Sequence, residues 1–124
     1  MVSYKKKFDA IKERQLMQKA RDCLERGEIE KGVDLLTKVI SLNPNNVEAL
    51  SRRLQVYYNM RQYDLAFADT EKALRLDPMI PDHHAVMASI LYQKGDYDSS
   101  LAISTTALDI LAKRNLPYGK VLAS

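Results

Sequence analysis

Apolar residues recur at every third or fourth position along residues 47–80, in two successive stretches separated by a short polar turn. In the first stretch, about 47–60, they are Leu50, Leu54, Tyr57 and Tyr58. In the second stretch, about 63–76, they are Ala66, Phe67, Ala73, Leu74 and Leu76. This spacing is the helical period, and Pro78 ends the second stretch because proline cannot continue a helix. The pattern predicts two amphipathic helices that are too short to bury both apolar faces alone.

The same pattern returns along the chain at a fixed offset, which is the spacing between Pro44 and Pro78. Each of these prolines is preceded by leucine and a polar residue. Small residues follow the same offset at Gly32, Ala66 and Ser100, and again at Val39, Ala73 and Ala107. The turns between paired helices are expected at Gly27, Arg61 and Gly95. The sequence therefore predicts three successive helix–turn–helix units.

This repeat resembles the tetratricopeptide (TPR) repeat, which is a helix–turn–helix unit of about 34 residues. The resemblance covers about residues 13–112. In the first repeat the large, small and proline positions fall on Leu16, Ala20, Cys23, Ile29, Gly32, Leu36, Val39 and Pro44. The departures are Leu54 at a usually small position, His84 at a usually large one, and Ala112 in place of proline. The resemblance implies an all-α solenoid of antiparallel helix pairs that winds as a right-handed superhelix.

The expected organisation is a single solenoid with extensions at both ends. We predict helices at 8–26, 29–42, 46–60, 63–76, 81–94 and 97–113, with the last running to Lys113 or Arg114. Residues 1–12 form a basic extension of the long first helix. The three repeats occupy 13–46, 47–80 and 81–114. Residues 115–124 form a short C-terminal cap or tail, with helical spacing between Tyr118 and Ala123.

Composition excludes several classes of protein. The net charge of +3 is mild and not concentrated on one predicted face, which disfavours nucleic-acid binding. No apolar run approaches the length of a membrane span, and the basic N-terminus lacks the apolar core of a secretion signal. The single cysteine, Cys23, falls on an inward-facing position and suits a reducing compartment. We therefore expect a cytoplasmic protein that does not bind a membrane.

No catalytic, cofactor or metal site is expected. His83 and His84 are adjacent, so on a helix they point about 100° apart and do not converge on one metal. His84 is expected to replace the usual large residue of its repeat as a partly buried side chain. The sequence contains no glycine-rich phosphate loop or nucleophile motif, and no nucleophile, base and orienting group can be assembled.

The TPR resemblance implies a peptide-binding groove on the concave face, formed by the first helix of each repeat. It assigns the groove to Arg14, Met17, Gln18, Arg21, Arg52, Gln55, Tyr58, Asn59, Ser89, Tyr92 and Gln93. The same repeat positions also contain Glu48, Ser51 and Asp82. Arginine pairs with carboxylates through two parallel hydrogen bonds, which favours a peptide with acidic character. The alternative is that these residues are ordinary solvated helix faces.

Three functions fit this sequence. The preferred one is a non-enzymatic interaction module, an adaptor or scaffold that binds a peptide in the groove. The second is a small structural or assembly subunit of a larger complex, held by its solenoid ends and convex face. The third is a co-chaperone that binds heat-shock chaperone C-termini, which use a five-residue clamp in TPR relatives. The clamp positions here are Met17, Arg21, Arg52, Asp82 and Val86, and Asp82 would repel the carboxylate of the tail.

The C-terminal end is a second candidate interaction surface. Leu108, Ile110 and Leu111 lie near an end that only the short segment 118–123 can cover. Terminal repeats of a solenoid need a polar cap, and an apolar end attracts a partner. The sequence therefore predicts self-association, or docking on a larger complex, through this end.

Overall fold

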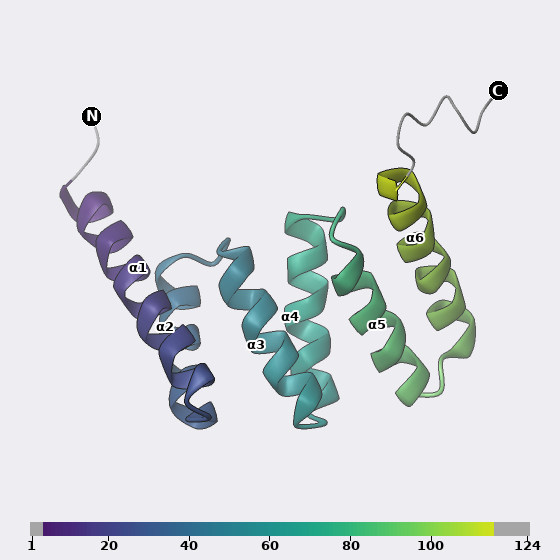
Figure 1. Ribbon diagram of the computed structural model, residues 1–124, viewed down its shortest axis with the longest axis horizontal. Coiled ribbons are helices and arrows are strands. Elements are labelled where there is room, and N and C mark those ends of the chain that lie inside the picture. Colours follow the sequence, from purple (N-terminus) through teal and green to yellow (C-terminus); the bar gives the residue numbers. More distant parts are fainter. Residues whose placement is uncertain (1–3, 116–124) are drawn as a thin grey trace.

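Six helices follow one another without strands in the part of the chain that the computed structural model describes, residues 4–115. They are α1 (Tyr4–Glu25), α2 (Ile29–Leu42), α3 (Val47–Asn59), α4 (Tyr63–Leu76), α5 (Pro81–Gln93) and α6 (Tyr97–Asn115). They form three antiparallel pairs in a row, with α1 at one end and α6 at the other (Figure 1). The predicted all-α solenoid is confirmed. The expected capping segment 118–123 lies outside the described residues.

The predicted helix boundaries hold in the middle of the chain and differ at its ends. The ranges 29–42 and 63–76 agree with α2 and α4. The first helix begins at Tyr4, not Phe8, and the last extends to Asn115. The last helix continues because Ala112 stands where the earlier repeats have the helix-ending proline. Asn46 caps α3, with its side-chain oxygen accepting a hydrogen bond from the backbone N–H of Ala49 at 2.9 Å.

Each helix pair closes through the same turn. In the first pair the backbone N–H of Glu28 donates to Cys23 and that of Gly27 donates to Leu24, at 2.8 and 3.1 Å. Equivalent bonds recur at the other two turns, and together they make the Schellman motif that ends a helix with a left-handed residue. The left-handed residues are Gly27 (φ 78°), Arg61 (φ 61°) and Gly95 (φ 87°). The predicted turn positions are therefore confirmed, with an arginine in the middle one.

Small residues bring the two helices of each pair close together. A Cβ atom added to Gly32 would lie 2.6 Å from Cδ2 and 2.8 Å from Cγ of Leu24, so the Leu24 side chain would have to move to admit it. Ala66 occupies the same place between α3 and α4 and is fully buried. Ser100 occupies it between α5 and α6 and donates to the carbonyl oxygen of Ala88 at 2.7 Å. The repeat offset therefore marks three equivalent close contacts between helices.

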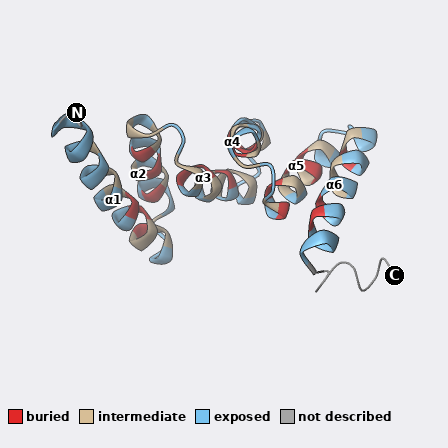
Figure 2. Ribbon diagram, turned by 90° about the horizontal axis from the view of Figure 1, so that it is seen from above, coloured by how far each residue is buried: buried red, intermediate tan, exposed pale blue. Residues whose placement is uncertain are grey.

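The core runs through the row as a chain of interfaces between neighbouring helices. Each helix carries buried residues on one part of its surface and exposed residues on the other (Figure 2). One cluster joins the first pair to α3 and is formed by Met17, Ala20, Leu36, Val39 and Ala49. The next joins α3 to α4 and is formed by Leu50, Leu54 and Ala73. A row of this kind exposes one broad face along α1, α3 and α5, which positions the candidate site.

Candidate functional site

The first helices of the three pairs contact one another through polar side chains, and we call this face the α1/α3/α5 surface. Arg21 of α1 binds Glu48 of α3. Ser51 of α3 is hydrogen-bonded to His83 of α5, with 2.7 Å between Oγ and Nε2. Further along the same helices, the hydroxyl of Tyr58 is hydrogen-bonded to the hydroxyl of Ser89. These contacts fix the relative positions of three helices that are distant in sequence.

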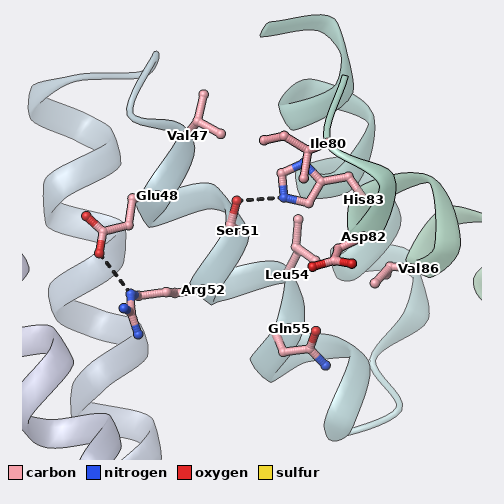
Figure 3. A pocket seen from close by; sticks show the side chains of 10 residues that line it. All are labelled: Val47, Glu48, Ser51, Arg52, Leu54, Gln55, Ile80, Asp82, His83 and Val86. Carbon is pink, nitrogen blue, oxygen red and sulfur yellow. Dashed lines mark hydrogen bonds and ion pairs between the residues drawn. The ribbon is translucent and has the colours of Figure 1, made fainter. Parts of the chain in front are cut away.

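A pocket of about 520 Å³ opens on this surface between α3 and α5 (Figure 3). Its apolar lining comes from Val47, Leu54, Ile80 and Val86. Its polar lining comes from Glu48, Ser51, Arg52, Gln55, Asp82 and His83. An apolar pocket with a few polar groups at its edge is the usual form of a ligand-binding site.

Two of the three predicted arginines of this face, Arg21 and Arg52, share one carboxylate. Glu48 accepts hydrogen bonds from Nη1 of Arg21 at 2.9 and 3.1 Å, and from Nε of Arg52 at 3.1 Å. Partial burial pushes the pKa of Glu48 up, but the hydrogen bonds and charges of the two arginines bring it below its ordinary value. The cluster therefore carries two positive charges and one negative charge, and its net charge is positive.

His83 is the buried histidine of this site. Its side chain is 5% exposed, and burial lowers the pKa of the imidazole against smaller opposing effects of Asp82 and Asp77. His84 instead is half-buried, and its Nε2 lies 2.6 Å from the carbonyl oxygen of Pro78. The expected partial burial of His84 is confirmed, while the sequence analysis did not anticipate the burial of His83. The repeat offset contained that signal, because it places His83 at the position of the fully buried Ala49.

The stability of the protein is expected to fall in mild acid because of His83. Its Nδ1 atom is buried and has no hydrogen-bond partner among the described residues, so protonation would leave an unpaired N–H. A folded-state pKa below the unfolded value of about 6.5 means that the unfolded chain binds the proton first. Stability is therefore lost as the pH falls below about 6.5, by at most about 1.4 kcal/mol per pH unit for one group.

Urea unfolding at pH 7 and pH 5 measures this effect. The groups that face the imidazole are Ser51 from α3, Asp77 from the loop, and Asp82 and His84 from its own helix. His83→Gln removes the titrating group and should flatten the pH dependence, whereas His84→Gln should retain it. An equal pH dependence in the wild type and in His83→Gln would contradict the assignment.

The predicted groove residues of α1 and α3 differ in whether their side chains reach the surface. Arg21 and Arg52 lie together around Glu48, and Gln18 accepts a hydrogen bond from Nη2 of Arg21 at 3.0 Å. Met17 is only 3% exposed and belongs to the core, so its side chain is not available on the surface. Its position in the repeat suggested exposure, but the rotation of α1 turns it towards α2. Arg14 remains exposed on α1.

The remaining predicted residues divide between α3 and the C-terminal end. Gln55 donates to Asn59 at 3.0 Å along α3. Tyr58 packs edge-on against Tyr63 and bonds to Ser89, while Tyr92 packs in the same way against Tyr97. Tyr92 lies in the last helix pair of the described residues, and its side chain is 60% exposed. Gln93 is also exposed at this end. Tyr92 and Gln93 are therefore distant from the arginine cluster along the row of helices.

A second pocket, of about 470 Å³, lies at the C-terminal end between α5 and α6. Tyr92, Leu108 and Leu111 line it and are 41–65% exposed. Ile110 was expected at the same end, but it is 7% exposed and packs inside, because it points to the opposite side of α6. The apolar character predicted for this end is therefore present in two of the three residues.

The described residues offer no metal-binding group of three or more histidine, cysteine, aspartate or glutamate side chains. Cys23 is buried as expected, at 3% exposure. None of the described helices is long and apolar enough to cross a membrane.

Comparison with known proteins agrees with this architecture. Residues 47–78 match the family model of the tetratricopeptide repeat. The chain is 29% identical over 87 residues to the tetratricopeptide repeat and J domain-containing co-chaperone DNJ1 of Fusarium oxysporum, covering 70% of this chain and 17% of that protein. It is 27% identical over 82 residues to the probable UDP-N-acetylglucosamine–peptide N-acetylglucosaminyltransferase SEC of Arabidopsis thaliana, covering 66% of this chain and 8% of that protein.

The fold has close counterparts among solved structures. The crystal structure of MamA superimposes with a TM-score of 0.77 at 20% identity, over 82% of this chain and 60% of that one. Identity at this level supports the fold alone. Because the chain spans less than a fifth of DNJ1 and of the transferase, the activities of those whole proteins do not transfer to it. The three helix pairs and their constant offset are typical of tetratricopeptide repeat proteins, and residues 47–78 match the repeat itself.

Proposed function

We propose that this chain is a non-enzymatic protein-interaction module, an adaptor or scaffold, that binds an extended peptide on the α1/α3/α5 surface. The pocket of about 520 Å³ between α3 and α5 is the observation that supports this best. It combines an apolar lining with charged groups at its edge, and all of its lining residues except Ile80 lie on helices. A site of this kind binds side chains that project from a partner. No cofactor is required, and the proposed location of the protein is the cytoplasm.

The charges around the pocket suggest the character of the peptide. The arginine cluster lies on the side of α1, whereas Asp82 lies at the start of α5. We propose that the ligand places an apolar side chain in the pocket and a carboxylate beside Arg21 and Arg52. Asp82 and Val86 remain unfavourable for a chaperone tail clamp, because one repels a carboxylate and the other has no donor. Co-chaperone activity is therefore not the function that we favour.

A peptide array with purified protein variants tests this function. Arg52→Glu should weaken binding of acidic, leucine-containing peptides about 5–20-fold, because it replaces a hydrogen-bonding cation with a repelling charge. Arg75→Glu on α4 is the matched control, since Arg75 is exposed, pairs only loosely with Glu71 at 4.0 Å and lies outside the pocket. Equal weakening by both variants would indicate a non-specific charge effect and would contradict the site.

The exposed C-terminal pocket supports a second candidate, a subunit that is held in a larger assembly or in a homo-oligomer. Tyr92, Leu108 and Leu111 provide its apolar surface. If no short peptide binds, a complex that survives Arg52→Glu but dissociates on Leu111→Glu would favour this second function. Sedimentation velocity over a concentration series, with Leu111→Glu beside the wild type, measures self-association through the same end.

A further inference from the structure

Glu48 occupies the place on the α1/α3/α5 surface where the carboxylate of a ligand would bind. It lies in the first turn of α3, one turn before Arg52, and it forms an ion pair with Arg21 of α1. Both of its oxygens receive hydrogen bonds from Nη1 of Arg21, and Oε2 also receives one from Nε of Arg52. The arrangement is that of an arginine pair closing on an acidic side chain, except that the acid belongs to the protein itself.

Two of the three nitrogens of Arg21 already donate hydrogen bonds within the protein. Its Nη2 donates to Gln18 at 3.0 Å, while its Nη1 donates to Glu48. Arg21, Arg52 and Glu48 are nevertheless well exposed, with side-chain exposures of 30%, 42% and 47%. Ion pairs at such exposure contribute little to stability and exchange readily with other partners. A peptide that brings its own carboxylate can therefore displace Glu48 without unfolding any helix.

We propose that Glu48 competes with acidic peptides for Arg21 and Arg52, and that this competition sets the specificity of the site. The proposal rests on the proposed peptide-binding function. A ligand that offers only a carboxylate gains little binding free energy at this site. It must first displace the Glu48 carboxylate, which is always close to the two arginines. A peptide that also fills the pocket formed by Leu54, Ile80 and Val86 gains enough contact to displace Glu48. Glu48 thereby lowers the affinity of every acidic peptide, so that an apolar anchor beside the acidic flanks becomes necessary for appreciable binding.

The test measures binding of a blocked, fluorescent pentapeptide with one leucine between two pairs of glutamates. Glu48→Gln should tighten its binding about 3–10-fold, because the freed arginines gain a partner without losing one. The binding should also become more sensitive to salt, since the cluster then carries two uncompensated charges. Glu71→Gln is the matched control, because it changes the net charge equally at an exposed glutamate that pairs with Arg75 on α4.

A double-mutant cycle separates this role from a purely structural one. In a background of Arg21→Gln and Arg52→Gln, Glu48→Gln should change the affinity much less, because it then relieves only the repulsion between Glu48 and the peptide. Glu48 also stabilises the positive N-terminal end of α3, so its loss can lower the melting temperature, but that effect would not alter the affinity or its salt dependence. A pentapeptide with one leucine between two pairs of glutamines should bind the wild type and Glu48→Gln equally.

The outcomes distinguish this inference from the proposed function. If the wild type binds peptides of the array but Glu48→Gln binds the glutamate pentapeptide no more tightly, the competitor role is wrong while the function remains. Weaker binding by Glu48→Gln would show that Glu48 helps to bind the ligand, and this result would also overturn the competitor role. If neither protein binds any peptide, the proposed function is wrong and the competitor role is lost with it.

Discussion

Asp69→Ala is expected to lower the free energy of unfolding by about 3–5 kcal/mol, which is the usual cost of removing one partner from a buried ion pair. The Asp69 carboxylate receives two parallel hydrogen bonds of 2.7 Å from Nε and Nη2 of Arg53. The two side chains are 8% and 17% exposed, so water cannot replace the missing carboxylate. Arg53 would be left with a nearly buried, unpaired charge.

The ion pair also joins three helices. Nη1 of Arg53 donates to Thr37 of α2 at 3.1 Å, and its guanidinium lies 5.7 Å from the ring centre of Tyr57. The hydrogen bonds from Arg53 to Asp69 raise the pKa of Arg53, so the arginine stays charged at every pH at which the protein is folded. Breaking the pair therefore loosens the contact between the first and second helix pairs as well as that within the second.

Urea unfolding of Asp69→Ala beside Asp64→Ala measures this effect. Asp64 pairs with Lys94 at 2.6 Å but is 91% exposed, so its replacement should cost at most about 1 kcal/mol. The double variant Arg53→Met with Asp69→Leu should recover much of the loss, because an apolar pair of similar volume carries no unpaired charge. Similar losses for Asp69→Ala and Asp64→Ala would show that the pair contributes no more than a surface contact.

Leu54→Ala is expected to destabilise the protein by about 2–5 kcal/mol, although a small residue is usual at this position of the repeat. Leu54 is 1% exposed and packs with Leu50 and Ala73. Its removal would leave a cavity between α3 and α4 that the neighbouring helices cannot close completely. The same side chain lines the pocket of the α1/α3/α5 surface, so the variant should also weaken peptide binding.

Thermal and urea unfolding of Leu54→Ala and Leu65→Ala provide the comparison. Leu65 is 50% exposed on α4, and its truncation should change stability by no more than about 0.5 kcal/mol. If Leu54→Ala were as stable as the wild type, the second repeat would be able to close around alanine, and Leu54 would be replaceable.

The sequence by itself determined the repeat architecture. Helical periodicity and proline positions are local properties, so they locate the helix pairs without knowledge of the partners. The constant repeat offset then identified the turns at Gly27 and Gly95 and the close contacts at Gly32 and Ala66. It also placed a turn at Arg61, where the residue type alone favours none. The arginines of the candidate site came instead from the resemblance to the tetratricopeptide repeat, which implies a groove along the first helix of each repeat.

Only the tertiary structure decided which side chains meet. The pairing of Arg53 with Asp69, and of Arg21 with Glu48, depends on how far each helix is rotated and how it crosses its neighbour. Periodicity gives a helical face to within about one residue, which is about 100° of rotation. That uncertainty is enough to turn Met17 from the surface into the core. The chemistry of the site depends on these rotations because a hydrogen bond tolerates an error of only a few tenths of an ångström.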